Sequence, residues 1–399
     1  VQYLLEHGAQ VDTQDIELRT PLFAALANDR LDVARLLIEQ GADVNITTRS
    51  GETALFPAAR ARHPQLVSLV LDQGTDVHVK DKKGYTPLHA AAEDGCATSA
   101  SILLERGAEV DAVTADGATA LLLASPRGDL RLIQLLLERG ADPKATDNRG
   151  YSAMHFAARQ GHWGTVQMLL RRGVPIDVPS TNGWTPLHMA AAHGRARLAD
   201  LLLEKSADIH ALTDKGETAL DLAEASLARV EAEDYAVGDK LRQRQYESFR
   251  KVAVMLRAVV SESIINAATA GDVEKLTCLL DTYPLFVDTQ KHYRTALQSA
   301  VLGNNLDVVR LVIARGADPT IRDNRNRTAY ELAVEKNYQE IAAILKRYED
   351  TVKQVFPAQM QEQEGEKSIF SNTDRCSKKR YHHTQKYAEK KLTFTTRNE

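Results

Sequence analysis

The feature of this sequence that most constrains its fold is a repeat of 33 residues. A Thr or Ser opens each copy, and these openings form two series with a constant step: Thr20, Thr53, Thr86, Thr119, Ser152, Thr185 and Thr218, then Thr295 and Thr328. Glycines keep the same step at Gly8, Gly41, Gly74, Gly107, Gly140 and Gly173. Such a period predicts a stack of similar units, because one short unit cannot bury its own apolar side chains and its neighbours must cover them.

The sequence pattern of each copy predicts two short helices. In the copy that opens at Thr185, the hydroxyl suits a helix N-cap, and Pro186 suits the first helical position, where no N–H is needed. The phrase "LHMAAAHG" predicts a first helix that ends at Gly194, with small alanines that let a neighbouring helix approach. The phrase "RLADLLLEK" predicts a second helix with leucines at helical spacing. Turn-forming residues such as "DNRG" (147–150) lead into the next copy.

The phrases "TPLHAAAEDG" (86–95) and "TPLHMAAAHG" (185–194) indicate which kind of repeat this is. With the period of 33 and the later "GAD" phrase, they resemble the ankyrin repeat over roughly residues 1–348. The resemblance implies an all-α helical repeat solenoid in which each unit has two antiparallel helices and a short β-hairpin finger. It also implies a protein that binds other macromolecules and has no chemistry of its own.

The phase of the repeat is interrupted once. Thr218 and Thr295 are 77 residues apart, 11 more than two periods, and "INAATAGDVEKLTCLL" (265–280) marks a hidden copy without the Thr-Pro-Leu-His phrase. The phrase "VAVMLRAVV" (252–260) predicts a displaced second helix for the seventh copy, which leaves little room for the next finger. The extra residues are interpreted as a tolerated surface insertion or, alternatively, as a docking element.

We therefore predict four parts of the chain. A first ankyrin array, with a partial first copy, covers 1–226, and a charged helical insertion covers 227–250. A second array with a polar C-terminal cap covers 251–350. A polar and then basic disordered tail covers 351–399, with eight Lys or Arg between 375 and 397.

Composition gives no indication of catalysis or of a bound cofactor. The net charge of −4 provides no general attraction to nucleic acid or membrane. The three cysteines are far apart, so neither a disulfide framework nor a zinc site is predicted. No uninterrupted apolar run reaches the roughly 18 residues of a membrane span. No nucleotide-binding, hydrolase, metalloprotease or kinase phrase is present, so we predict no catalytic, cofactor-binding or metal-binding residue.

A histidine recurs at one phase, as His89, His155 and His188. A recurrent histidine could indicate a metal site or a catalytic group. Other copies, however, carry Phe23, Phe56, Leu122 and Asp221 at this place, and a ligand set would not be replaced by Phe and Leu. The ankyrin resemblance implies that this histidine braces neighbouring turns through hydrogen bonds.

The candidate binding residues are those that packing leaves free to vary. In ankyrin-like proteins these are the finger tips and the outer end of the first helix, which line the concave face. Tyr85, Tyr151 and Trp184, each just before an opening Thr or Ser, predict an aromatic row, and such residues are enriched at interface hot spots. The alternative is that these rings pack on their own fingers. The full predicted partner-binding set is Tyr85, Glu93, Asp94, Arg127, Tyr151, Arg159, Gln160, Trp184 and His193.

The predicted function is that of a noncatalytic scaffold or adaptor that binds a loop, helix or peptide of another protein. The alternative is the recognition or regulatory part of a larger enzyme or channel, such as a ubiquitin ligase, kinase or acyltransferase. Its effector domain would precede Val1, since the opening phrase "VQYLLEHGAQVD" begins inside a copy. A small-molecule substrate is not expected, because a solenoid offers a broad groove and no deep pocket. Nucleic acid is expected only as a weak ligand of the basic tail. We expect a cytoplasmic protein, with nuclear location as the alternative that the basic tail allows.

Overall fold

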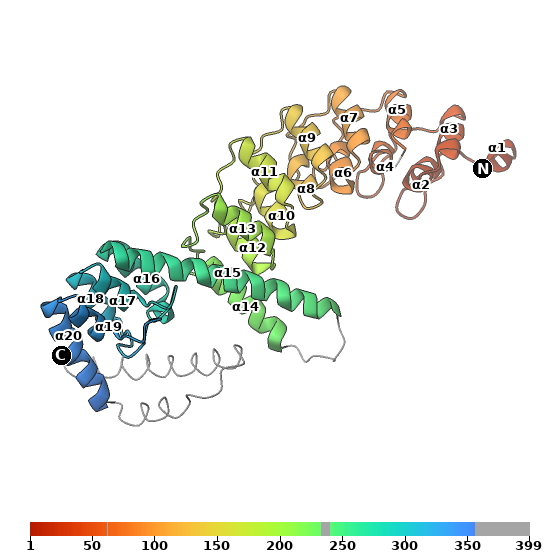
Figure 1. The fold of residues 1–399 in the computed structure, drawn as a ribbon. Coiled ribbons are helices and arrows are strands. Elements are labelled where there is room, and N and C mark those ends of the chain that lie inside the picture. The colour runs from red at the N-terminus through yellow and green to blue at the C-terminus, as the bar shows by residue number, and fades with distance from the viewer. Residues whose placement is uncertain (62, 233–239, 356–399) are drawn as a thin grey trace. The chain divides into compact units, whose positions relative to one another are not determined.

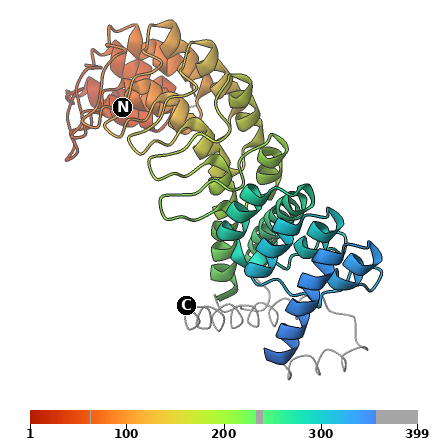
Figure 2. The ribbon, with the colours of Figure 1, turned by 90° about the vertical axis from the view of Figure 1, so that its left-hand side faces the viewer.

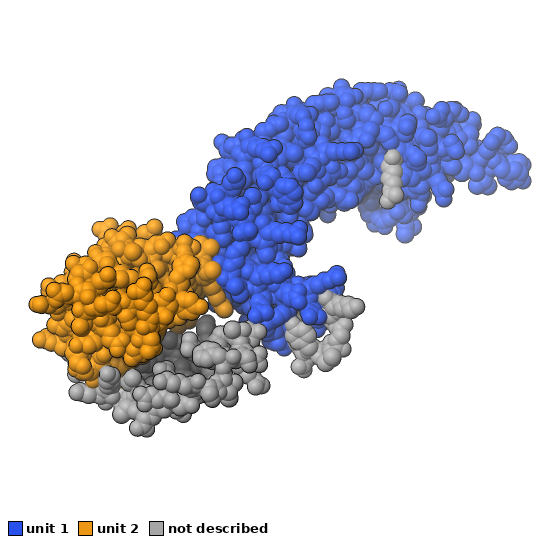
Figure 3. Space-filling model, in the orientation of Figure 1, with its two compact units in different colours: residues 1–256 blue, residues 257–399 orange. Residues whose placement is uncertain are grey.

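A computed structural model describes residues 1–61, 63–232 and 240–355 of the chain (Figure 1). The basic segment 375–397 and part of the predicted insertion, 233–239, lie outside the described residues. The chain divides into two compact units, residues 1–256 and residues 257–399 (Figure 3).

Outside the interruption of the repeat, each full copy forms a pair of short helices. The first helices are α2 (Pro21–Ala27), α4 (Leu55–Arg60), α6 (Pro87–Asp94), α8 (Ala120–Ala124), α10 (Ala153–Gln160), α12 (Pro186–Ala192), α14 (Ala219–Ala232), α17 (Ala296–Leu302) and α19 (Ala329–Glu335). The second helices are α3 (Leu31–Glu39), α5 (Gln65–Leu71), α7 (Ala97–Glu105), α9 (Leu130–Glu138), α11 (Trp163–Arg171), α13 (Ala196–Glu204), α16 (Val273–Thr282), α18 (Leu306–Ala314) and α20 (Gln339–Val355). The remaining elements are α1 (Gln2–Glu6), α15 (Lys240–Ala270) and the short 3₁₀ helix η1 (Pro284–Phe286).

Within the first unit the helices form two layers (Figure 1). First helices pack on first helices, as α6 does on α4 and α8, and second helices pack on second helices, as α7 does on α9. The paired alanines allow this close approach: Ala91, Ala92, Ala190 and Ala191 are completely buried. The all-α solenoid predicted from the repeat is therefore confirmed.

The opening Thr residues cap the first helices as predicted, with one exception. The Thr86 hydroxyl accepts a hydrogen bond from the N–H of His89, and Thr20, Thr119 and Thr185 make the same contact in their copies. At Thr53 the helix begins later, at Leu55, with Ala54 already in the helical conformation. The Thr53 hydroxyl is consequently buried without a hydrogen-bond partner among the described residues.

The fingers project to one side of the stack as loops (Figure 2). The predicted β-hairpin strands are not confirmed: in the described parts of the chain only two isolated bridges occur, Thr146 with Ser152 and Lys291 with Arg294. Adjacent fingers are joined instead by single backbone hydrogen bonds between their tips. The Thr181 N–H, for example, donates to the Arg149 carbonyl at 3.0 Å, and the Asp214 N–H donates to the Asn182 carbonyl at 3.1 Å.

A second set of contacts joins adjacent copies at the opposite end of the first helices. The side chain next to each inter-helix glycine reaches back to a carbonyl at the end of the preceding first helix. His162 contacts the Pro126 carbonyl at 2.8 Å, and Arg195 donates to the Arg159 carbonyl at 2.9 Å. These bonds satisfy carbonyls that a helix end leaves without an intrahelical partner.

The interruption of the repeat is occupied by one continuous helix, α15. Its residues 252–260 were predicted as a displaced second helix and residues 265–270 as the start of a hidden copy. The structure joins both in the single helix Lys240–Ala270, so no finger separates them. Near its beginning, Ser248 donates to the Gly194 carbonyl, as a second helix of the seventh copy should. The boundary between the two compact units falls within this helix, after Leu256.

By length and composition, α15 is the one described helix that could cross a membrane. Its most apolar stretch has a mean hydropathy of 1.4. The sequence expectation counted only uninterrupted apolar runs and did not detect it. Val252, Leu256, Val260 and Ile264 recur every four residues and are completely buried. These four side chains form a buried stripe along the helix, and 44% of its most apolar stretch is buried.

The inter-finger hydrogen bonds predict which glycines resist substitution. Gly140 and Gly150 both have φ values in the left-handed region, +92° and +74°. A Cβ atom at Gly150 would lie 2.6 Å from the Thr181 backbone nitrogen, whereas a Cβ atom at Gly140 would meet nothing within 4 Å. Both alanine variants should lose roughly 1 kcal/mol to the left-handed conformation. Gly150→Ala should lose clearly more, because the Thr181 hydrogen bond must shift.

Urea unfolding followed by circular dichroism measures this difference. Equal midpoints for Gly150→Ala and Gly140→Ala would show that contact between fingers does not contribute to the stability of the stack.

Candidate protein-binding surface

The recurrent histidines connect neighbouring copies. The Nδ1 atom of His89 accepts the Thr86 N–H at 3.1 Å, and its Nε2 atom contacts the Ala118 carbonyl of the next copy at 3.1 Å. His155 and His188 repeat this arrangement, with the Trp184 and Ala211 carbonyls as partners at 2.9 and 3.1 Å. The bracing role that the ankyrin resemblance implied is confirmed. An acceptor at Nδ1 and a carbonyl at Nε2 require the neutral imidazole with its proton on Nε2.

Burial lowers the pKa of His89, His155 and His188 below the ordinary value of 6.5, although their carbonyl partners oppose this change. The copy that opens at Thr295 shows that a neutral side chain is sufficient. There Gln298 accepts the Thr295 N–H at 2.9 Å and donates to the Ile321 carbonyl at 2.9 Å. The framework thus needs one acceptor and one donor at this place and no positive charge.

In several copies the residue before the opening Thr lies along the first helix of its own copy. Glu52 forms an ion pair with Arg60, eight residues later, at 2.9 Å. Arg327 pairs with Glu335 in the same way. The side chain therefore runs from the base of the finger to the far end of the helix. We call the surface made by these side chains and the first helices α4 to α14 the groove face.

Tyr85 follows the same path. Its ring packs on His89 with 5.3 Å between ring centroids. Burial, followed by the negative charge of Glu93, raises the pKa of the Tyr85 hydroxyl. Glu93 is eight residues after Tyr85, so these two predicted site residues meet on the groove face. Asp94, the neighbour of Glu93, lies 3.7 Å from the Arg60 guanidinium of the preceding copy.

Tyr151 and Trp184 are half-buried at the same position of their copies. Tyr151 contacts His155 edge-on with centroids 5.4 Å apart, and the Arg149 guanidinium lies over its ring at 5.4 Å. The Trp184 ring lies 6.3 Å from that of His188. Each ring thus packs partly on its own copy, as the alternative interpretation expected, and keeps part of its surface open to solvent.

The polar members of the predicted set lie at the other end of the first helices. Arg127 donates to the Glu93 carbonyl at 3.0 Å, so its guanidinium is committed to the framework. Gln160 accepts a hydrogen bond from Arg195 at 3.4 Å, and His193 contacts the Met189 carbonyl at 3.0 Å. Burial lowers the pKa of His193. The Arg159 side chain is exposed to solvent and is available for contact with a partner.

The sequence analysis did not predict the apolar residues of the first helices that form the floor of the groove face. The residue four places after the opening Thr or Ser lies between the two ends of the first helix, and Phe156 at this place lies 6.1 Å from the Tyr151 ring. Leu123, Phe156 and Leu222 are half-buried there, with the nearly buried Met189 in the same series. The signal was available, since the three earlier copies carry Ala24, Pro57 and Ala90 at this phase. Larger apolar residues replace them in the four copies from Thr119 to Thr218.

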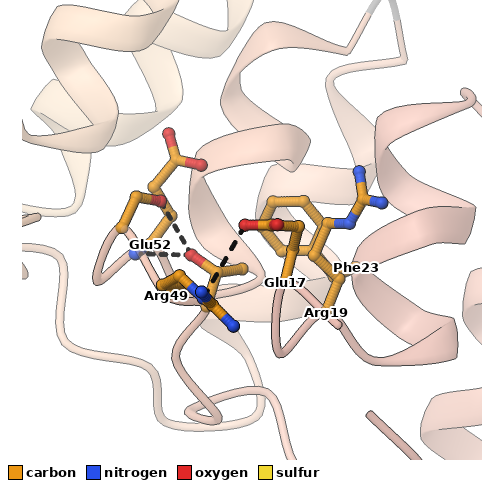
Figure 4. A pocket seen from close by; sticks show the side chains of 7 residues that line it. Glu17, Arg19, Phe23, Arg49 and Glu52 are labelled. Atoms are coloured by element: carbon orange, nitrogen blue, oxygen red, sulfur yellow. Dashed lines mark hydrogen bonds and ion pairs between the residues drawn. The ribbon is translucent and has the colours of Figure 1, made fainter. Parts of the chain in front are cut away.

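A hollow of about 450 Å³ lies at the fingers of the first two full copies (Figure 4). Phe23 lies at the hollow, and Glu17 and Arg49 face each other across 3.9 Å. Arg19 is held by Asp15 at 2.9 Å. The hollow is open to solvent, and each of its charged groups forms an ion pair: Glu17 with Arg49, Arg19 with Asp15 and Glu52 with Arg60. Among the described residues, no group of three or more His, Cys, Asp or Glu could hold a metal ion.

Models of ankyrin repeats match most of the chain. A three-copy model matches residues 1–48, 46–114, 107–180 and 264–354, and a many-copy model matches residues 169–223. Among solved structures, the crystal structure of the human ASB11 ankyrin repeat domain is 26% identical, with a TM-score of 0.47, and the match covers 58% of this chain and 98% of that one. The search of curated proteins gave no match.

The histidine contacts predict a pH dependence of stability. The unfolded chain titrates these groups near 6.5, whereas the folded chain titrates them lower, so the unfolded state binds more protons as the pH falls below about 6.5. The stability that the neutral histidines contribute is present above that pH and is lost as the pH falls toward the folded-state pKa. The variant His89→Gln/His155→Gln/His188→Gln should fold, as Gln298 indicates, and should lose less stability on acidification.

Urea midpoints at about pH 7.5 and about pH 5.5 test this, because a histidine changes its charge within this interval. The carboxylates are common to both proteins, so the difference between the two pH slopes isolates the histidines. Identical slopes would contradict the assignment of a buried neutral state.

Proposed function

The chain belongs to the ankyrin repeat family, and from this premise we propose that it is a noncatalytic scaffold that binds a segment of a partner protein along the groove face. Ankyrin repeats are generally protein–protein interaction modules. The observation that supports this surface is the continuous apolar floor of Leu123, Phe156, Met189 and Leu222 beside the rings of Tyr151 and Trp184. Stacking of the copies does not require these larger side chains, because Ala24 and Ala90 serve at the same phase.

The partner segment that suits this surface carries apolar side chains along one side. Phe156, Tyr151 and Trp184 offer apolar area that is only half covered, and burial of such area drives association. An amphipathic helix or a loop laid across several copies would bury it, in the manner of helix-in-groove recognition. The Arg149 guanidinium over the Tyr151 ring and the exposed Arg159 favour an acidic residue at the edge of that segment.

A noncatalytic role agrees with the way the polar groups are used. His89, His155 and His188 are held in one tautomer by backbone partners and are buried, so they cannot exchange protons with a substrate. Each charged side chain that lines the hollow of Figure 4 forms an ion pair. We further propose a cytoplasmic location, with nuclear import through the basic segment 375–397 as the alternative.

The aromatic residues of the groove face provide the first test. In a pull-down with the full chain, Tyr85→Ala/Tyr151→Ala/Trp184→Ala should lose partners that the unchanged chain retains. For a purified partner, each ring should be worth about 2 kcal/mol, or roughly 30-fold in affinity, if it is a hot spot. Phe156→Ala should weaken binding of the same partner, because it removes part of the floor.

Tyr3→Ala is the matched control, because Tyr3 is an exposed ring on α1, outside the groove face. Urea unfolding confirms that each variant is folded. A folded triple variant that retains every partner would show that the groove face is not the binding surface.

The basic segment is tested separately. Deletion of residues 375–397 should leave a fluorescently tagged chain in the cytoplasm, whereas the intact chain should enter the nucleus if the segment acts as an import signal. The same distribution for both proteins would exclude that role.

A further inference from the structure

The inter-helix loops of three successive copies form a second surface, apart from the groove face. At the starts of α9, α11 and α13, Trp163 is 58% exposed and Leu130 is 43% exposed, and both occupy the first helical position of their helices. Arg131 and Arg197 follow at the second helical position, and both are exposed. We call Leu130, Arg131, Trp163 and Arg197 the basic edge.

The two arginines stand where a helix disfavours positive charge. The N-terminal turn of a helix carries partial positive charge from its free N–H groups, so acidic residues stabilise it and basic residues do not. Other copies of this chain follow that rule at the same position, with Asp32 in α3, Glu274 in α16 and Asp307 in α18. Arg131 and Arg197 break it, and neither forms an ion pair with any described residue. Helix stability therefore does not explain their presence.

Between the two arginines, the second position of α11 is Gly164. Glycine inside a helix lowers its stability relative to alanine. A Cβ atom at Gly164 would lie 3.0 Å from the Leu130 side chain, so the absence of a side chain lets Leu130 lie against the helix. The result is an apolar strip of Leu130, Gly164 and Trp163, with the exposed Arg131 on α9 and the exposed Arg197 on α13. Three local departures from helix preference thus coincide at one place on the surface.

From this arrangement we infer that the basic edge docks an acidic segment of a partner protein that carries an apolar anchor residue. The apolar strip takes the anchor, and the two guanidiniums take carboxylates, to which Arg binds in a planar, bidentate geometry. Neighbouring helices pack 8–10 Å apart, so Arg131 and Arg197 are roughly 16–20 Å apart. An extended chain rises about 3.3 Å per residue, so the acidic residues should stand about five or six positions apart, with the anchor between them.

This surface is separate from the one in the proposed function, and two surfaces would allow the chain to join two partners. Leu130, Trp163 and Arg131 lie on second helices, whereas Tyr151, Phe156 and Trp184 lie on fingers and first helices. The two surfaces can therefore be inactivated independently.

Fluorescence anisotropy with the full chain tests the inference. The probes are a labelled peptide of sequence EDGFGDE, its basic counterpart KKGFGKK and a labelled twelve-nucleotide oligothymidylate. The unchanged chain should bind EDGFGDE, with an affinity that falls as salt is added, and should not bind KKGFGKK. Arg131→Glu/Arg197→Glu and, separately, Trp163→Ala should each weaken binding about tenfold or more.

The control Arg35→Glu/Arg171→Glu changes the net charge by the same amount at exposed arginines away from the basic edge and should bind as the unchanged chain does. Tyr85→Ala/Tyr151→Ala/Trp184→Ala should also retain binding, which separates this result from the test of the groove face. Urea midpoints give an independent readout. Arg131→Glu/Arg197→Glu should be at least as stable as the unchanged chain, because acidic residues suit the first helical turn.

Several outcomes would overturn the inference. They are no binding of EDGFGDE by the unchanged chain, equal binding by the Arg131→Glu/Arg197→Glu variant, or equal weakening in the Arg35→Glu/Arg171→Glu control. Tighter binding of the oligothymidylate than of EDGFGDE would assign the basic edge to nucleic acid. A fall in stability that matches the loss of binding would instead indicate that the arginines have a structural role.

Discussion

The structure depends on hydrogen bonds that cross from one copy of the repeat to the next. The His155 imidazole reaches the Trp184 carbonyl, Arg195 reaches the Arg159 carbonyl, and the Thr181 N–H reaches the Arg149 carbonyl. Each bond satisfies a polar group that a short helix or an isolated finger would leave exposed or unpaired. The copies therefore stabilise one another, and a single copy has little stability of its own.

Because many residues are needed for contacts between copies, only certain positions are available for binding a partner. The buried histidines, the capping threonines and the alanine pairs are committed to contacts between copies. The positions that remain are the residue before each cap, the residue four places after it, and the starts of the second helices. In this chain those positions hold Tyr151, Phe156, Trp163 and Trp184, which are large and only partly covered. One framework therefore leaves two sets of partly covered side chains in different parts of the copy.

Much of the fold could be predicted because a repeat provides many copies of the same local signal. The caps at Thr86 and Thr185 and the small residues between the helices follow from short-range chemistry. Thr53 did not behave as predicted, because α4 begins a residue later and leaves its hydroxyl unsatisfied. The pairing of Tyr85 with Glu93 was not foreseen either, although both residues were chosen. Tyr85 meets Glu93 because the Tyr85 side chain lies along the helix. The position of a residue in the repeat does not show the direction in which its side chain points.

The sequence by itself determined the helix pairs outside the interruption, their boundaries to within a few residues and the structural role of the recurrent histidines. Its strict period repeats one pattern of caps, small residues and leucines, and that pattern has one stable arrangement. Only the tertiary structure decided that residues 252–270 form a single helix, because burial of Val252, Leu256, Val260 and Ile264 outweighs the phase of the repeat. It also decided which charged side chains form contacts between copies. Arg127 and Arg131 look equivalent in the sequence, but Arg127 donates to the Glu93 carbonyl of the preceding copy and Arg131 is exposed.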